Sequence, residues 1–161
     1  MTKTNAARIL DRKGIQYELL AYGVDESDLS AIAVAEKLHQ PVDQVYKTLV
    51  LRGDKSGIFV CIIPGAEELD LKKAARISGN KSAEMVHMKE IFSLTGYVRG
   101  GCSPLGMKKD YPTFIDECCI LRDHIFVSAG IRGMQLKIAP EDLIKATSCR
   151  TGDLRVQKNQ G

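Results

Sequence analysis

The sequence contains no apolar run long enough to cross a membrane. The longest clean run covers residues 58–63, whereas a membrane-spanning helix needs about 20 apolar residues. No apolar segment typical of a signal peptide follows Met1, so we expect a cytoplasmic protein rather than a secreted one. Internal repeats and low-complexity linkers are also missing, and with a length of 161 residues this favours one domain.

Two further classes of protein are excluded by what the cysteines and histidines lack. The five cysteines are odd in number and include no Cys-x-x-Cys spacing, so a reducing cytosol fits better than a disulfide framework. The three histidines, His39, His87 and His124, lie far apart and at no metal-ligand spacing from a cysteine or carboxylate. We therefore expect no metal site and no cofactor.

Charge is distributed unevenly along the chain. Residues 1–70 carry 8 basic and 11 acidic residues, whereas residues 71–161 carry 15 basic and 9 acidic ones. The basic clusters Lys72-Lys73 with Arg76, Lys108-Lys109, and Arg132 with Lys137 would form a modest positive face for phosphates if the fold gathered them. The alternative is a set of solvated charges, which are common on globular domains.

The apolar and turn residues predict short helices interleaved with short strands. Helices are predicted at residues 6–13, 31–38, 71–77, 88–94 and from 140 onward, and strands at 15–22, 45–52, 58–63, 83–86, 113–116, 125–128 and 134–138. Hairpin connections require a mixed sheet. We expect a single α/β domain at residues 1–148, with a curled, barrel-like mixed β-sheet surrounded by short helices. Residues 149–161 are expected to form a polar, frayed tail.

Lys47 is the first candidate for chemistry. Alternation along its strand places it on one face with Val45, Leu49 and Leu51, so a lysine interrupts an apolar row. Burying an ammonium without a partner is costly. Either this ammonium reaches water past a strand end, or it points into a pocket that requires a positive charge.

Residues 100–106 form the most unusual segment, with the sequence Gly-Gly-Cys-Ser-Pro-Leu-Gly. Glycines let the backbone approach a ligand closely, and successive N–H groups can bind an anion. The segment is not a Walker A loop, because Gly106 precedes Met107 rather than a lysine. A plain connecting loop is the alternative. Cys102 is interpreted as a small buried residue, because no base that could activate a thiol nucleophile is close in the sequence.

Small residues follow a predicted strand at residues 127–133, Val-Ser-Ala-Gly-Ile-Arg-Gly, and suit either a tight turn or a pocket wall. Ser128 lacks the Gly-x-Ser-x-Gly frame of a nucleophile elbow, so a serine nucleophile is unsupported.

Five segments in this order resemble the YbaK/EbsC family. They are residues 43–49, 69–73, 95–106 with Lys108-Lys109, 112–116 and 127–133. Together they extend the resemblance over nearly the whole chain, from the first helix to about Ile144. The resemblance implies a trans-editing deacylase that removes cysteine from proline tRNA that has been mischarged with it. It would act on the aminoacyl-tRNA acceptor end, with prolyl-tRNA synthetase as a possible partner.

The resemblance also implies roles for individual residues. Lys47 matches the essential lysine of the family and would be catalytic. The residues that match pocket positions are Tyr22, Leu29, Thr48, Gly100, Gly101, Ser103, Pro104, Ser128 and Gly130. Relatives often have Phe where Leu29 stands and an acidic residue where Gln135 stands, so both departures bear on substrate preference. For such enzymes the resemblance implies substrate-assisted cleavage, in which the substrate's own thiol attacks its ester.

Three other functions stay open. The same reaction could act on alanyl- or seryl-tRNA. The pocket could instead belong to a non-catalytic module that binds RNA ends or nucleotides, or the protein could regulate a synthetase by binding it.

Overall fold

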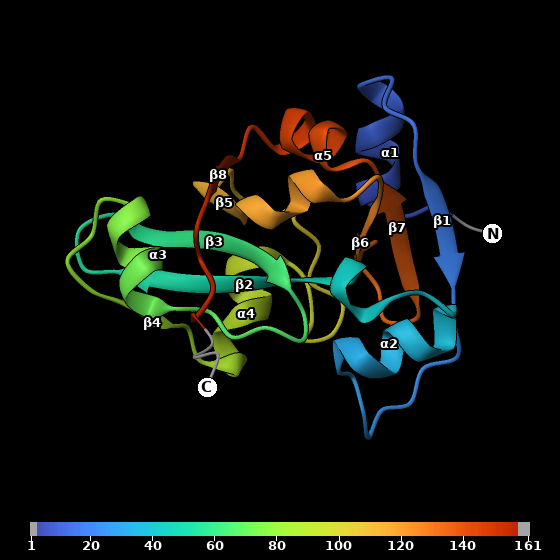
Figure 1. Ribbon diagram of the computed structural model, residues 1–161, viewed down its shortest axis with the longest axis horizontal. Helices are drawn as coiled ribbons and strands as arrows, with labels where there is room; N and C mark the ends of the chain where they lie inside the picture. Colours follow the sequence, from blue (N-terminus) through green and yellow to red (C-terminus); the bar gives the residue numbers. More distant parts are fainter. Residues whose placement is uncertain (1–2, 158–161) are drawn as a thin grey trace.

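The computed structural model describes residues 3–157, and within this range the strands form two sheets (Figure 1). In the three-stranded sheet, β7 (Met134–Ile138) lies between β1 (Glu18–Ala21) and β6 (Ile125–Ser128), and both pairings are antiparallel. The five-stranded sheet has the order β4 (Ala83–Met85), β2 (Tyr46–Gly53), β3 (Gly57–Pro64), β5 (Thr113–Asp116) and β8 (Arg150–Gly152). Its β3–β5 and β5–β8 pairings are parallel, so the predicted mixed α/β domain is confirmed.

The expected single barrel-like sheet is wrong. The two sheets are joined by a parallel bridge between Val45 and Phe126, and hydrogen bonding does not continue from this bridge into a closed barrel. Beyond the bridge, β6 pairs with β7 and β2 pairs with β4. The hydrophobic pattern predicted every strand except β8, but which edges meet depends on long-range packing.

The helices are short, and α1, α2 and α3 begin directly after cap residues that the sequence marks. They are α1 (Asn5–Arg12), α2 (Ala31–Leu38), η1 (Val42–Gln44), α3 (Leu71–Ile77), α4 (Met88–Thr95), η2 (Glu117–Leu121) and α5 (Pro140–Thr147). The side chains of Thr4, Ser30 and Asp70 accept hydrogen bonds from the first turns of α1, α2 and α3, which satisfies backbone donors that a helix start leaves unpaired. No helix of the described range is long and apolar enough to span a bilayer.

The core consists of three packed groups. Helices α1 and α5 contribute Leu10 and Leu143 to the largest group, which lies against one face of the three-stranded sheet. A second group joins α3 to β2 and β3. In the third group, Val34 and Ala35 of α2 pack against Val45 and Phe126, where the two sheets meet. The junction of the sheets is therefore covered by α2, and the candidate site residues of β2 and β6 follow directly after it.

The expectation of a frayed segment from Cys149 onward does not hold for residues 149–157. Residues 150–152 form β8 and extend the sheet beyond β5, while the Leu154 side chain is fully buried. The backbone N–H of Leu154 donates to Asp116 Oδ2 at 2.9 Å. The segment thus contains one apolar anchor, Leu154, and that residue also donates its N–H to a buried acceptor on β5; both contacts hold the segment against the domain. Residues 158–161 lie outside the described range.

Candidate functional site

The Lys47 ammonium is held by a main-chain carbonyl. Its Nζ donates to Glu67 O at 2.8 Å, in the segment that connects β3 to α3, and the side chain is partly buried. Burial lowers the pKa of Lys47 below its ordinary value of 10.5, while the charges of Glu68 and Glu67 oppose this shift. The lysine is thus a partly desolvated cation that contacts protein, an arrangement that stabilises negative charge better than a lysine in bulk water.

Lys47 and Ser128 lie on the same face of neighbouring strands. The Val45–Phe126 bridge is parallel, and both bridge residues belong to the group packed under α2. Residues two positions along a strand share a face, so Lys47 follows Val45 and Ser128 follows Phe126 on that face. Strands β2 and β6 are in contact. The structure therefore supports the grouping of these two predicted site residues.

The middle of β2 has an edge without a partner strand. On this edge β2 meets β6 at Val45 and β4 at residues 51–53, and the N–H of Val86 donates to Val50 O. Hydrogen-bonding direction alternates along a strand, so the N–H and C=O of Thr48 point to the same edge as the C=O of Val50. Among the described residues no strand pairs with Thr48 there. Thr48 thus offers a main-chain donor and acceptor between the two sheets.

Two buried side-chain oxygens at this junction lack a hydrogen-bond partner within the described range. They are Thr48 Oγ1 and Gln135 Oε1. Gln135 is 5% exposed and stands beside Ser128 in the register of β6 and β7. A buried polar group left unpaired costs about 1–3 kcal/mol, so such groups are typical of sites that a ligand completes. The side chain of Thr48 points away from that of Lys47, because adjacent residues of a strand face opposite sides.

The glycine-rich segment packs against the loop that follows β6. A Cβ at Gly101 would lie 3.2 Å from both the backbone N of Arg132 and the backbone C of Ile131, so a side chain here would push these backbone atoms away by a few tenths of an ångström. Gly130 has a left-handed φ of 107° and lies against the ring of Tyr97. The Arg132 Nε donates to Arg99 O at 2.7 Å, which ties the two loops together. Segments about 30 residues apart in sequence therefore contact each other and form one wall.

The N–H groups of this loop are less available than an anion-binding nest requires. The N–H of Gly101 already donates to Val98 O at 3.0 Å and closes a turn. Ser103 is fully buried, and its Oγ accepts the N–H of Leu105 at 3.2 Å. Pro104 lines a cavity of about 540 Å³ on the side of α1 and α5. These residues shape the loop, and only its Gly100 end lies against Leu29.

The remaining predicted residues border the same junction. Leu29 approaches Gly100 so closely that a Cβ on the glycine would lie 3.1 Å from Leu29 Cδ1. Tyr22 packs in the group under α2, and its N–H donates to Gly133 O at 2.9 Å. Ser128 is 9% exposed, and its Oγ accepts the N–H of Gly130 at 3.1 Å. That contact leaves the Ser128 hydroxyl proton free to donate to a ligand.

The cysteine of the glycine-rich segment is unsuited to act as a nucleophile. Burial raises the pKa of Cys102 to about 11, so the thiol stays protonated near neutral pH. Reactive cysteines instead have lowered pKa values beside positive charge. Within the described residues no group of three or more His, Cys, Asp or Glu side chains could hold a metal ion.

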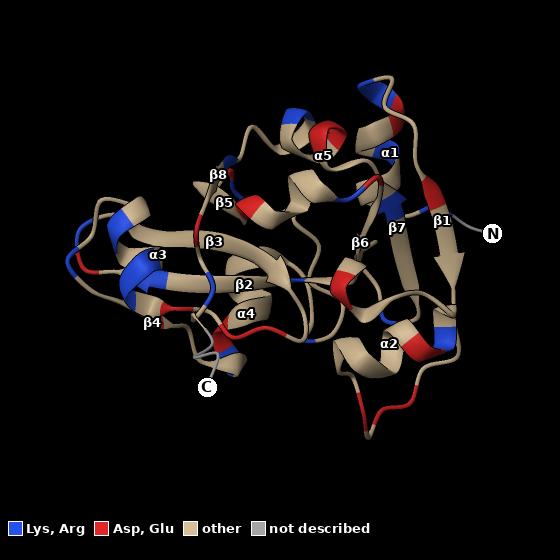
Figure 2. Ribbon diagram, in the orientation of Figure 1, with Lys and Arg blue, Asp and Glu red and all other residues tan. Residues whose placement is uncertain are grey.

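The basic clusters of the second half of the chain do not gather on one face. Figure 2 shows Lys and Arg residues distributed over several elements and interleaved with Asp and Glu. Lys73 pairs with Asp153 at 2.9 Å, and Arg132 pairs with Glu26. The interpretation of solvated, locally paired charges therefore fits better than a phosphate-binding face.

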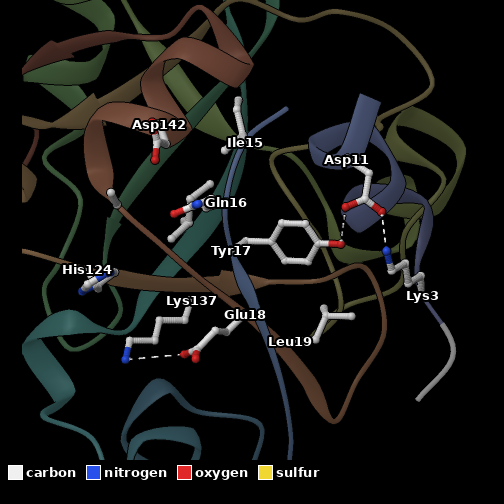
Figure 3. A pocket seen from close by; sticks show the side chains of 12 residues that line it. Lys3, Asp11, Ile15, Gln16, Tyr17, Glu18, Leu19, His124, Lys137 and Asp142 are labelled. Carbon is white, nitrogen blue, oxygen red and sulfur yellow. Dashed lines mark hydrogen bonds and ion pairs between the residues drawn. The ribbon is translucent and has the colours of Figure 1, made fainter. Parts of the chain in front are cut away.

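A cavity of about 850 Å³ lies beside β1, and its lining includes none of the predicted catalytic or pocket residues (Figure 3). In it, Asp11 accepts hydrogen bonds from Lys3 Nζ at 2.7 Å and from Tyr17 Oη at 2.8 Å. Lys137 faces Glu18 at 3.6 Å across two neighbouring strands. Its charged groups largely neutralise one another, so this cavity offers no strong recognition element.

A family model described as "Aminoacyl-tRNA editing domain" matches residues 26–146. The chain belongs to this family, so the predicted resemblance is confirmed, as is the enzyme class, an aminoacyl-tRNA deacylase. The chain is 44% identical over 156 residues to a protein of Enterococcus faecalis (strain ATCC 700802 / V583) named "Putative Cys-tRNA(Pro)/Cys-tRNA(Cys) deacylase EbsC". That match covers 97% of this chain and 95% of the relative.

Solved structures share the fold over almost the whole chain. One is described as "a putative trans-editing enzyme for prolyl tRNA synthetase" and has a TM-score of 0.81 at 25% identity, covering 97% of this chain and 100% of that one. Another, hypothetical protein APE2540, has a TM-score of 0.84 at 21% identity, covering 92% of this chain and 97% of that one. The second likeness concerns the fold alone.

Sequence reasoning missed two features of the junction. Gln135 was singled out only as a departure from relatives, and its unpaired buried oxygen becomes visible once β7 is placed beside β6. The open edge at Thr48 had no sequence signal, because it depends on where β4 and β6 end. For Gln135, the available signal was an amide side chain in a strand of mostly apolar residues.

Proposed function

We propose that this protein is a trans-editing deacylase that removes cysteine from mischarged proline tRNA. The observation that carries the proposal is the partly buried Lys47 ammonium on the same face as Ser128, which stands beside the unpaired Gln135 oxygen in the register of β6 and β7. Membership of the editing-domain family supports the class of reaction, and the name of the Enterococcus faecalis relative supports the amino acid and the tRNA.

Such an activity would correct a selection error that prolyl-tRNA synthetase makes for a physical reason. Prolyl-tRNA synthetase distinguishes proline from smaller amino acids mainly by size, and a missing methylene provides only about 1–3 kcal/mol of discrimination. Cysteine is close to proline in volume, so it escapes this selection. A separate hydrolytic site must then clear the product. Because an aminoacyl ester is already reactive, that site needs orientation and charge stabilisation more than a strong nucleophile.

We propose that the substrate supplies the nucleophile. The sulfur of the esterified cysteine loses its proton to solvent and attacks its own carbonyl carbon, and the ester C–O bond breaks. The terminal ribose oxygen takes up a proton from solvent and leaves with the tRNA. The cysteine departs as a four-membered thiolactone, which water then opens. No protein nucleophile is required, in keeping with the protonated state of Cys102.

The junction residues would orient this substrate. Lys47 would neutralise negative charge at the ester or at the terminal adenosine, and the free hydroxyl proton of Ser128 would bind the carbonyl oxygen. The main-chain N–H and C=O of Thr48 would form hydrogen bonds with the aminoacyl group. The Gln135 side-chain oxygen would accept a hydrogen bond from the α-ammonium of the esterified cysteine. Leu29 and Gly100 would limit the size of the side chain that fits.

Specificity for one tRNA requires more than this domain displays. Its charges are locally paired, so it would grip mainly the acceptor end. We propose that prolyl-tRNA synthetase presents the mischarged tRNA. A structure with the same fold is described as a trans-editing enzyme for that synthetase.

A deacylation panel tests the substrate. Proline tRNA carrying cysteine, alanine or serine is incubated with the protein, and the remaining ester is followed over time. We expect cysteinyl-tRNA to be cleaved fastest and a substrate lacking the thiol to be spared. Equal cleavage of alanyl- or seryl-tRNA would contradict the role of the thiol. Binding of tRNA without any deacylation would instead favour a non-catalytic module.

A second test concerns the enzyme's own thiol. Cys102→Ala should have only a mild effect on deacylation, because the Cys102 thiol stays protonated. Complete loss of deacylation in a folded variant would instead favour an enzyme-borne nucleophile.

A further inference from the structure

We infer that Arg155 is a positioning residue for Lys47, acting by anchoring the segment of residues 64–69 to the buried Asp116. The inference rests on the proposed function, because it assigns to Arg155 the placement of the ammonium used in that reaction. It also gives a purpose to the C-terminal residues 153–156, which the sequence pattern left as a polar tail.

The anchor is a carboxylate inside the domain. Asp116, at the end of β5, is fully buried, and its two oxygens accept the N–H groups of Cys118 at 3.0 Å and Leu154 at 2.9 Å. The Nε of Arg155 lies at an ion-pair distance of 3.2 Å from Asp116 Oδ1, but it is not aligned for a hydrogen bond and has no such partner among the described residues. A buried carboxylate is stabilised only when it is paired and hydrogen-bonded. This pair therefore holds the Arg155 side chain at a defined place.

The same guanidinium reaches the residue that holds Lys47. Its Nη1 lies 3.8 Å from Glu67 Oε1, and the main-chain oxygen of Glu67 accepts the hydrogen bond from Lys47 Nζ at 2.8 Å. Arg155 is thus placed between the buried carboxylate of Asp116 and the partly exposed carboxylate of Glu67, whose main chain accepts the hydrogen bond from Lys47. Partly exposed ion pairs contribute little to stability, so the pairing with Glu67 is better explained by positioning than by folding energy.

Main-chain hydrogen bonds hold the segment on the C-terminal side of Glu67. The N–H of Val156 donates to Glu68 O at 2.9 Å, and the N–H of Asp70 donates to Leu154 O at 2.8 Å. The buried side chain of Leu154 fixes these residues against the core. The carbonyl that receives Lys47 is therefore placed by the C-terminal segment, whose residues are about 90 positions away in sequence.

Placement of this kind has a large kinetic effect. A displacement of about 1 Å in a catalytic group can lower a rate by roughly a hundredfold. Releasing Glu67 from Arg155 would let the Lys47 ammonium swing toward water and lose its alignment with the Ser128 face.

The test compares Arg155→Ala with Asp153→Asn in the full-length protein. Asp153 lies in the same segment and pairs with Lys73 at 2.9 Å, so its variant loosens the segment without touching Glu67. For each protein, kcat and KM of cysteinyl-tRNA deacylation are measured. The pKa of Lys47 is measured separately by NMR titration of the ¹³C-dimethylated protein, which reports on Lys47 without requiring activity.

We expect Arg155→Ala to lower kcat on the order of tenfold with little change in KM, and to move the pKa of Lys47 up toward 10.5. Asp153→Asn should change neither value, and Arg155→Lys, which keeps the charge, should retain more activity than Arg155→Ala. If Arg155→Ala does not fold, Glu67→Gln keeps the pair with Asp116 and removes the charge that faces Arg155. It is expected to lower kcat in smaller measure with little change in KM, and to lower the pKa of Lys47 further, because the Glu67 charge raises that pKa.

Equal behaviour of Arg155→Ala and Asp153→Asn in both measurements would overturn the inference. If the unmodified protein deacylates no tRNA, the proposed function fails. The titration of Lys47 then decides by itself whether Arg155 positions this ammonium.

Discussion

The cavity beside β1 and the junction between β2 and β6 are two polar regions of very different character. The cavity has a volume of about 850 Å³, but Lys3, Asp11 and Tyr17 bind one another within it (Figure 3). At the junction the polar groups are fewer, and Thr48 Oγ1 and Gln135 Oε1 are buried without a partner in the described range.

This comparison indicates that unpaired polar groups identify a binding site better than cavity volume does. Mutually paired, exposed charges are already solvated or neutralised and gain little from a ligand. Buried groups without a partner raise the free energy of the empty protein, and a ligand that pairs with them recovers that cost. Variants that change one region and leave the other intact test this comparison, with deacylation and stability as the measured quantities.

The largest effect is expected for the lysine of the junction. Lys47→Ala should lower deacylation by on the order of a hundredfold or more, since it removes the cation that stabilises developing charge. Lys3→Ala, in the cavity beside β1, should leave deacylation unchanged. Single-turnover deacylation of cysteinyl-tRNA measures both. Full activity in Lys47→Ala would remove this lysine from the mechanism.

The same lysine should leave a signature in stability. Burial lowers its pKa in the folded state, so the folded protein binds this proton less tightly than the unfolded chain. Its contribution to stability is unfavourable below the folded-state pKa and improves as pH rises from there to 10.5. Lys47→Met should therefore be at least as stable as the parent at neutral pH, and thermal unfolding at several pH values should show this advantage shrinking toward pH 10.5. A large loss of stability at neutral pH would contradict a functional role for the burial.

An intermediate effect is expected where the two loops touch. Gly101→Ala places a Cβ 3.2 Å from backbone atoms of Ile131 and Arg132, which cannot move without shifting the loop after β6. Deacylation should fall on the order of tenfold because the wall beside Ser128 is displaced. Gly23→Ala is the matched control, since its Cβ would meet nothing within 4 Å. Equal activity of the two variants would show that this contact does not shape the site.

The smallest effect concerns the unpaired hydroxyl of the junction. Thr48→Val should raise the free energy of unfolding by about 1 kcal/mol and leave deacylation nearly unchanged, because the hydroxyl that is lost has no partner in the described protein and points away from Lys47. Thr95→Val is the opposite case. Thr95 Oγ1 donates to Ile91 O at 2.7 Å and accepts the N–H of Tyr97 at 3.0 Å, so this variant should lose about 1–3 kcal/mol. Denaturant unfolding distinguishes them, and destabilisation by Thr48→Val would contradict an unpaired hydroxyl.

Much of the fold could be predicted from local pattern. Asp70 accepts the N–H groups of Lys72 and Lys73 as a helix cap should, and Lys47 stood out because it interrupts the apolar alternation of a strand. Family resemblance assigned both glycine-containing loops to the pocket, whereas residue chemistry alone left each of them open to a plain connecting role. Neither source predicted that the N–H of Gly101 donates to Val98 O, because that turn depends on how the loop closes.

The sequence by itself determined the helices, most strands and the candidate lysine, because caps, turns and alternation act between residues close along the chain. Tertiary structure alone decided that the strands form two sheets, that Thr48 has an open edge and that Arg155 reaches Asp116 and Glu67. These features join residues up to about 90 positions apart. They result from many weak contacts formed together, so no short stretch of sequence encodes them.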